Sequence, residues 1–164
     1  MNMDASAVRD DWPSVQLRPF ADDDFAAVFA IDQQCFPREI AYSRGELRYF
    51  LKHPRSFCMV AEEAGELAGF FIAETTMASG KRIGHIITID VAPSQRRGGT
   101  GTALMGACEQ RLRALGCVST HLEVAMDNEA AIRFYARLGF EQSGRLPGYY
   151  AGKRDAFTMI KMLE

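Results

Sequence analysis

The residues best suited to chemistry lie between positions 86 and 101, where the chain reads IITIDVAPSQRRGGTG. A run rich in β-branched residues is followed by a proline, two arginines and a glycine-rich turn, and after Thr102 by the amphipathic segment ALMGACEQRL. This pattern predicts a strand, a turn and the start of a helix, whose first N–H groups have no partner within the helix. The turn therefore indicates an anion site, and a pyrophosphate is the anion we expect there.

Two common phosphate-binding loops do not fit the spacing. A P-loop needs a Lys-Ser/Thr pair after its last glycine, and a dinucleotide-binding turn needs Gly-x-Gly-x-x-Gly with an acid further on. The chain instead carries Arg96, Gly99 and Gly101 in the pattern Arg-x-x-Gly-x-Gly. This pattern resembles the acetyl-CoA signature of the GNAT acetyltransferase superfamily, Q/R-x-x-G-x-G/A.

A second block extends the resemblance. Residues 122–140, LEVAMDNEAAIRFYARLGF, are similar to the other conserved block of the family. The run from residue 86 to the end is similar to one branch, the bacterial ribosomal-protein-alanine N-acetyltransferases. The resemblance implies a single-domain GNAT fold, acetyl-CoA as co-substrate, no metal, and transfer of an acetyl group to an amine.

Attack of an amine on a thioester needs a base for the ammonium proton, a donor for the carbonyl oxygen and a group that receives the thiolate. The resemblance implies that Glu123 is the base and Tyr135 the general acid. Because strand residues alternate between faces, Glu123 points away from Leu122 and Val124. A free tyrosine, with a pKa of about 10, is a weaker acid than a thiol at about 8.5, so we expect Tyr135 mainly to hydrogen-bond the developing thiolate. A solvated strand glutamate and a packed helix aromatic are the structural alternatives.

The resemblance also implies the coenzyme contacts. Ile89, Asp90 and Val91 would offer main-chain groups to the pantetheine arm, and the Val91 N–H would hold the acetyl oxygen. Asn128 would contact the coenzyme, and its residue type and position also predict a helix cap. The doubled glycine in the turn departs from the family pattern and makes the turn more flexible. The turn that would wrap the pyrophosphate consists of Arg96, Arg97, Gly98, Gly99, Thr100, Gly101 and Thr102.

The acceptor side is marked less clearly. The segment RLPGYYAGKRDA at residues 145–156 is similar to a hairpin that covers the incoming amino terminus in the alanine N-acetyltransferase branch, so Tyr149 and Tyr150 are the candidate substrate contacts. Phe36 and Tyr42 are expected in the opposite wall. We interpret His85 as a strand-face residue and not as a second base, because no motif supplies it with an acid partner.

The elements that must position these residues alternate along the chain. Predicted strands cover residues 15–18, 56–62, 67–76, 82–91, 118–125 and 156–162, with a further strand around Glu141. Predicted helices begin at residues 22–24, 43, 99 and 128. The order is β-α-α-β-β-β-α-β-α-β-β, which indicates an α/β (α+β) fold with a mixed, mostly antiparallel sheet of about six to seven strands and about four helices.

The composition indicates one domain at residues 15–164, preceded by a flexible tail at residues 1–14. The chain has 164 residues, 48% of them apolar, four cysteines and a net charge of −2. This charge balance argues against nucleic acid as a partner, and no apolar run reaches the length of a membrane span. The amino terminus lacks the pattern of a signal peptide. We therefore expect a cytoplasmic protein with reduced cysteines, and the oligomeric state stays open.

Three functions fit these observations. The first is an acetyl-CoA-dependent N-acetyltransferase acting on the N-terminal α-amine of a protein or peptide, with a ribosomal protein among the candidates. An α-amine with a pKa of about 7.8 is about 14% neutral at pH 7, against under 0.1% for a lysine, so a weak base suffices for it. The second is a small-molecule amine or antibiotic acetyltransferase. The third, a non-catalytic acyl-CoA sensor, is disfavoured by the presence of both Glu123 and Tyr135.

Overall fold

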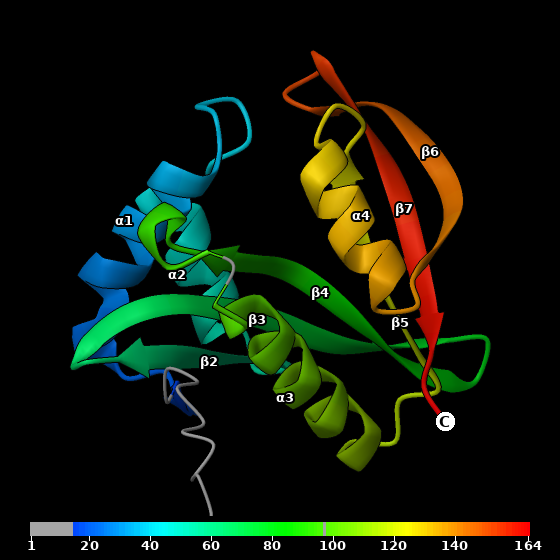
Figure 1. Ribbon diagram of the computed structural model, residues 1–164. Coiled ribbons are helices and arrows are strands. Elements are labelled where there is room, and N and C mark those ends of the chain that lie inside the picture. Colours follow the sequence, from blue (N-terminus) through cyan, green and yellow to red (C-terminus); the bar gives the residue numbers. More distant parts are fainter. Residues whose placement is uncertain (1–14, 97) are drawn as a thin grey trace, which may run out of the picture.

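The fold is a seven-stranded sheet with four α-helices, in the predicted order (Figure 1). The computed structural model describes residues 15–96 and 98–164. Neighbouring strands follow the order β1-β2-β3-β4-β5-β7-β6, and every pair is antiparallel except β4–β5. The strands are β1 (Gln16–Pro19), β2 (Ser56–Glu63), β3 (Glu66–Ala78), β4 (Lys81–Val91), β5 (Ser119–Ala125), β6 (Glu141–Tyr150) and β7 (Arg154–Met162), and the helices are α1 (Phe25–Cys35), α2 (Arg44–Lys52), α3 (Thr100–Ala114) and α4 (Glu129–Arg137).

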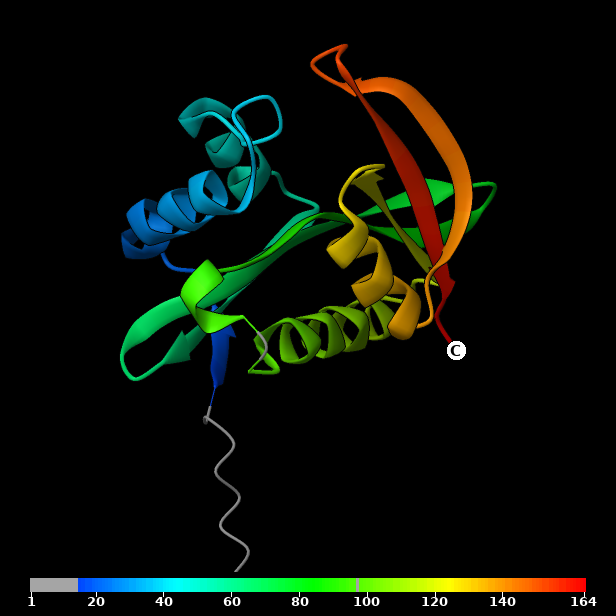
Figure 2. The same ribbon diagram turned by 45° about the horizontal axis from the view of Figure 1, so that its top comes forward.

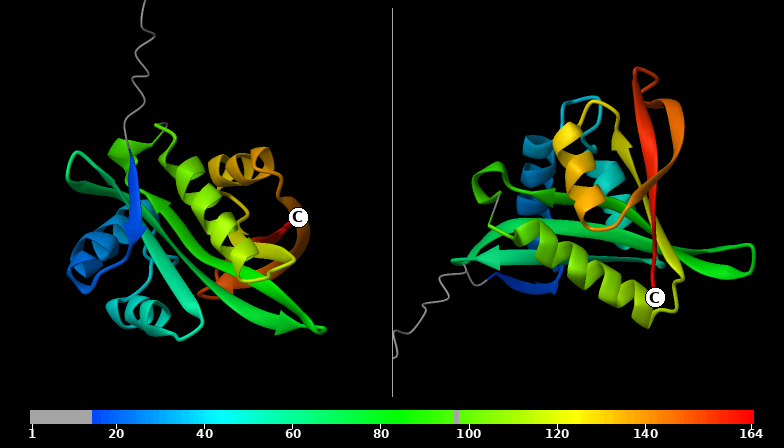
Figure 3. Two further views of the ribbon diagram at one scale, coloured as in Figure 1. Left: turned by 90° about the horizontal axis from the view of Figure 1, so that it is seen from below. Right: turned by 45° about the vertical axis from the view of Figure 1, so that its right-hand side comes forward.

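The sheet is covered on both faces (Figure 3). One hydrophobic cluster joins the sheet to α3 and α4, and includes Leu104, Leu112 and Leu122. The other joins the opposite face to α1 and α2 through Val28 and Leu47, which are fully buried. Within the described residues, no helix is both long and apolar enough to span a membrane.

β4 and β5 pair only at their beginnings. Their register consists of Gly84 opposite Thr120 and His85 opposite His121. Beyond these pairs the strands diverge, and β5 continues beside β7 (Figures 1 and 2). We call the diverging parts, residues 86–91 of β4 and 122–125 of β5, the β4–β5 fork. Within the fork, each of the two strands is paired on its outer side only, so the main-chain groups on the side that faces the fork have no strand partner.

A β-bulge in β4 sets the face of the sheet on which each following side chain lies. Ile72 of β3 pairs with Thr88 and Ala73 pairs with Ile86, so β4 has one extra residue at Ile87. Ile86 and Ile89 pack in the cluster under α3, whereas Ile87 packs in the cluster under α1 and α2. The alternation of faces therefore shifts by one residue at the bulge.

Hydrogen bonds confirm the predicted helix start at residue 43. The Ser43 hydroxyl accepts from the Glu46 N–H, and the Glu46 carboxylate accepts from the Ser43 N–H, which forms a capping box. Helix α3 ends at Ala114, Gly116 follows it with a φ of 85°, and the Cys117 N–H donates to the Leu112 carbonyl. The predicted tail at residues 1–14 lies outside the described residues.

Candidate active site

The glycine-rich turn begins α3 with free donors. Gly99 precedes the helix with a φ of 84°, a conformation that glycine adopts without strain, and no described side chain caps this end. The first hydrogen bond within the helix runs from the Ala103 N–H to the Gly99 carbonyl. The N–H groups of Thr100, Gly101 and Thr102 therefore lack partners within the helix, which is the arrangement that binds a pyrophosphate.

The two flanking glycines of the turn differ in their packing. A Cβ on Gly101 would lie 3.2 Å from Phe134 Cζ on α4 and 3.6 Å from Val91 Cγ2, so Gly101 allows α3 to approach α4 and β4 closely. A Cβ on Gly98 would meet only the Gln95 carbonyl oxygen, at 3.8 Å. The predicted contact Arg97 lies outside the described residues.

Main-chain groups of β4 face the fork at alternate residues. The Ala92 N–H donates to the Ala68 carbonyl of β3, and in an antiparallel pair every second residue points the same way. Asp90 therefore directs its main chain toward β3, and a Cβ on Gly69 would lie 2.5 Å from its carbonyl oxygen. Ile89 and Val91 direct theirs into the fork. Of the predicted main-chain contacts, these two are oriented to meet a pantetheine arm.

The Val91 carbonyl already has two donors. It accepts from Arg96 Nε at 3.2 Å and from the Cys35 thiol at 3.3 Å. The Arg96 side chain is thus directed at β4. Burial, followed by the charge of Asp90, raises the pKa of Cys35 to about 11, so this cysteine stays a neutral thiol at neutral pH.

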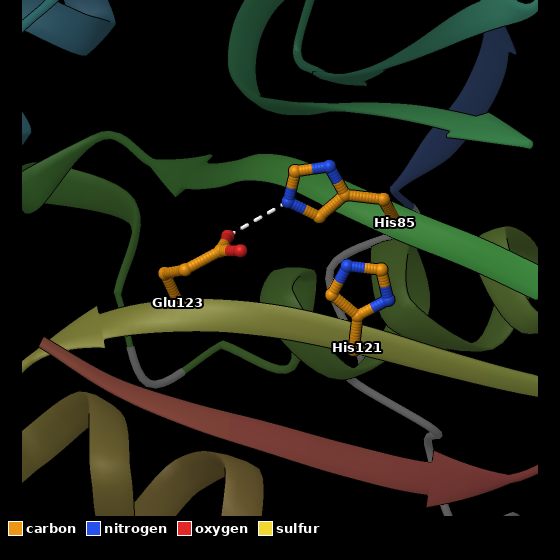
Figure 4. Close-up of side chains that lie close together, drawn as sticks. All are labelled: His85, His121 and Glu123. Carbon is orange, nitrogen blue, oxygen red and sulfur yellow. Dashed lines mark hydrogen bonds and ion pairs between the residues drawn. The ribbon is translucent and has the colours of Figure 1, made fainter. Parts of the chain in front are cut away.

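At the start of the fork, His85 faces the carboxylate of Glu123 (Figure 4), and a second carboxylate, that of Glu74, lies on the other side of its ring. His85 Nε2 lies 2.7 Å from Glu123 Oε2, and His85 Nδ1 lies 3.3 Å from Glu74 Oε1. The ring of His121 stacks on that of His85, with ring centroids 4.5 Å apart and planes 1° from parallel. His85 does lie on strand β4, as predicted, but the structure supplies the acid partners that no motif indicated.

Charge distinguishes the two histidines. Burial lowers the pKa of His85, but hydrogen bonds and charges from Glu123 and Glu74 outweigh burial and hold its pKa above the usual value. The pKa of His121 is lowered, first by burial and then by the charge of His85. The two carboxylates outnumber the single positive charge that His85 can carry, so the cluster has a net negative charge, which suits the approach of an ammonium group. The side chains of His85 and Glu123 are 21% and 14% exposed, so the cluster remains open to a ligand.

Tyr135 lies on α4 in apolar surroundings. Its ring packs edge-on against Phe134 and Phe140, with centroid distances of 5.4 and 5.8 Å. Burial, and then the charges of Asp90 and Tyr150, raise the pKa of Tyr135 well above its usual value. Its hydroxyl therefore stays protonated and can donate a hydrogen bond. Asn128 caps the same helix, accepting from the Ala131 N–H at 3.2 Å as predicted.

Two tyrosines lie near Glu123, and a third, Tyr42, lies near these two. Tyr149 and Tyr150 end β6 and pack edge-on at 4.9 Å, and the charge of Glu123 contributes, after burial, to raising the pKa of both. Tyr42 precedes α2, and its hydroxyl donates to the Ile87 carbonyl at 3.4 Å. Burial, followed by the charges of Tyr149 and Tyr150, raises its pKa. Phe36 directly follows α1 and is half-buried, outside both described hydrophobic clusters.

A buried pair of carboxyl groups, Asp32 and Asp90, lies beside Tyr42. Asp32 on α1 accepts from the Tyr42 N–H at 2.8 Å, and Asp90 accepts from the Thr88 hydroxyl at 2.5 Å. The remaining oxygens, Asp32 Oδ1 and Asp90 Oδ2, are buried without another described partner. Burial raises the pKa of both groups, and the charge of Asp32 raises the pKa of Asp90 further. We therefore expect the pair to hold a proton that two exposed carboxyl groups would lose. An acid within the apolar run IITIDVA was the only sequence signal for it.

A forked sheet beside the free N–H groups that begin α3 is suited to the coenzyme of an acyl-transferring enzyme. The chain belongs to the GNAT family of acetyltransferases, whose family model matches residues 25–140. It is therefore an acetyl-CoA-dependent N-acetyltransferase.

Three relatives illustrate the likeness. The chain is 33% identical over 146 residues to an uncharacterized N-acetyltransferase of Methanocaldococcus jannaschii, covering 88% of this chain and 90% of that one. It is 33% identical over 120 residues to N-alpha-acetyltransferase 30 of Schizosaccharomyces pombe, covering 73% and 80%. The crystal structure of the ribosomal-protein-S18-alanine N-acetyltransferase from Escherichia coli superposes with a TM-score of 0.77 at 25% identity, covering 92% and 94%.

Proposed function

We propose that this enzyme transfers the acetyl group of acetyl-CoA directly to the N-terminal α-amine of a protein or peptide. The observation that carries the proposal is the position of Tyr149 and Tyr150 near Glu123, with Tyr42 beside these two tyrosines and a cluster of net negative charge around Glu123. Tyrosine walls suit a peptide main chain, because each offers an apolar face and a hydroxyl. The negative cluster attracts an ammonium group and can take its proton.

The residues of the fork are suited to hold acetyl-CoA. The pyrophosphate would bind the first-turn N–H groups of α3, with charge added by the arginines before them, and Asn128 would contact the coenzyme beside α4. The pantetheine arm would pair with the main chain of Ile89 and Val91 as an added strand. The Val91 N–H would then hold the acetyl oxygen, which gains negative charge in the transition state.

Glu123 acts as the base in this proposal. Its Oε2 faces His85, so His85 orients the carboxylate and Glu74 holds His85 from the other side. The amine loses its proton to Glu123 and then attacks the acetyl carbon. Because an α-amine is already about 14% neutral at pH 7, a weak base such as a carboxylate is sufficient.

Tyr135 stabilises the leaving thiolate by a hydrogen bond. Its raised pKa makes it a poor proton donor, which supports a role as hydrogen-bond donor over that of a full acid. The thiol of Cys35, with a pKa of about 11, is not a nucleophile at neutral pH. This favours direct transfer over an acetylated cysteine intermediate.

Mass spectrometry of acetylated products tests the acceptor. We expect transfer to peptides with a free amino terminus, and no transfer to the same peptides with a blocked terminus and a free lysine. A ribosomal-protein amino terminus is the first peptide to test, because the chain is similar to the Escherichia coli enzyme. Transfer only to polyamines or aminoglycosides would refute the proposal and favour a small-molecule acceptor.

A further inference from the structure

Three side chains at the base of the fork are of the types that bind transition metals. His85, His121 and Glu123 each offer one ligand atom, and these atoms lie within 4.8 Å of one another. The strand register explains their convergence, because His85 and His121 are paired residues and Glu123 lies two residues after His121 on the same face of β5. Two imidazoles and a carboxylate form a ligand set that suits zinc.

Each histidine also has the second partner that a metal ligand usually needs. A ligating histidine commonly donates its other ring N–H to a carboxylate or a backbone carbonyl, which fixes the ring. His85 Nδ1 faces Glu74 Oε1 at 3.3 Å while Nε2 faces Glu123. The main chain of Gly84 lies within hydrogen-bonding reach of the His121 ring. Figure 4 shows the two rings and the carboxylate arranged around a common space.

We propose that His85, His121 and Glu123 bind one Zn²⁺ ion and that this ion inhibits acetyl transfer. The ion replaces the proton held between His85 and Glu123, and that proton leaves to solvent. Three protein ligands leave a fourth position for water. Inhibition rests on the proposed function, because the metal occupies the carboxylate that would accept the proton of the amine. Metal binding itself does not depend on that function.

Calorimetric titration of the metal-free, reduced protein with zinc chloride tests the binding. We expect one ion per chain, and affinity reduced at least about 10-fold in His121→Gln and in His121→Phe, the second of which keeps a ring to stack on His85. His53→Gln removes a histidine on a different part of the surface and should bind as the wild type does. With cobalt(II), the wild type should show the visible absorption of a tetrahedral site, and both His121 variants should lose it.

An acetyl transfer assay tests the inhibition. Each protein is compared with its own rate in the presence of a chelator. Without the chelator, His121→Phe should need at least about 10-fold more zinc than the wild type for half inhibition. Stoichiometric binding that survives both His121 substitutions, binding through cysteine thiolates seen as a near-ultraviolet cobalt band, or no binding would each overturn the site. Binding without inhibition would overturn the regulatory role. If metal-free protein acetylates no peptide, the proposed acceptor fails, while calorimetry and the cobalt spectrum still decide the metal site.

Discussion

Replacement of Glu123 by glutamine should slow acetyl transfer by an amount that depends on pH. The substitution keeps the shape of the side chain that faces His85 at 2.7 Å but removes its ability to accept a proton. Loss of a general base commonly costs about 10²- to 10⁴-fold in rate. We expect the lower end at pH 7, because part of the α-amine is neutral without help.

The pH dependence follows from the amine. With a pKa of about 7.8, the neutral fraction of an α-amine rises from about 14% at pH 7 to about 94% at pH 9, an increase of about 7-fold. The activity of Glu123→Gln should therefore rise about 7-fold over this range, whereas the wild type should rise less. A lysine acceptor, with a pKa of about 10.4, would give an increase of about 100-fold. The same curve therefore distinguishes the two kinds of amine.

The assay is the initial rate of acetyl transfer from acetyl-CoA to a peptide with a free amino terminus. It is measured with saturating coenzyme from about pH 6.5 to about pH 9.5, in steps of about 0.5 pH unit. Glu74→Gln is the matched control, since it removes an equal charge from the other side of His85, at 3.3 Å. It should retain most activity. A defect in Glu123→Gln that is the same at every pH, with thermal unfolding unchanged, would refute proton acceptance by Glu123.

Three further outcomes are expected. Tyr135→Phe should lower kcat by about 10- to 100-fold with little change in KM for acetyl-CoA, because a hydrogen bond to a charged group contributes about 1.5–3 kcal/mol; an unchanged kcat would contradict the role. Gly69→Ala places a Cβ 2.5 Å from the Asp90 carbonyl oxygen and should cost about 1–3 kcal/mol in urea unfolding, whereas Gly45→Ala, which meets nothing within 4 Å, should not destabilise. Asp90→Asn should gain stability relative to the wild type as pH rises. The raised pKa of the Asp32–Asp90 pair means that the folded wild type holds an extra proton, and the stability that this proton contributes is lost at higher pH, by at most about 1.4 kcal/mol per pH unit. If the melting temperatures of the two proteins change in parallel from pH 4 to 9, the pair holds no such proton.

Most of the fold could be predicted because its signals are local. The capping box at Ser43, the cap at Asn128 and the glycine after α3 each fix an element end within a few residues, and the structure contains all three. The turn between β2 and β3, where Gly65 has a φ of 78°, is equally local. The fork could not be read from local signals, because it depends on β5 pairing with β7 over its whole length and with β4 over two residues only.

The same distinction applies to the site. The alternation of faces predicts the orientation of Glu123, since Leu122 and Val124 are buried and Glu123 is not. The partners of His85 belong to strands β3 and β5, so finding them requires the register between strands and not the order along one strand.

The bulge at Ile87 decides the role of Asp90. Strict alternation would place Asp90 on the same face as Ile86, among the apolar residues under α3 and on the opposite side of the sheet from Asp32. The extra residue in β4 moves it to the opposite face, where Asp32 of α1 meets it. The same shift leaves Ile89 and Val91 with side chains under α3 and main chain toward the fork. The extra residue therefore places Asp90 next to Asp32 and also leaves the main chain of Ile89 and Val91 facing the fork. Deletion of Ile87 should disrupt both of these arrangements.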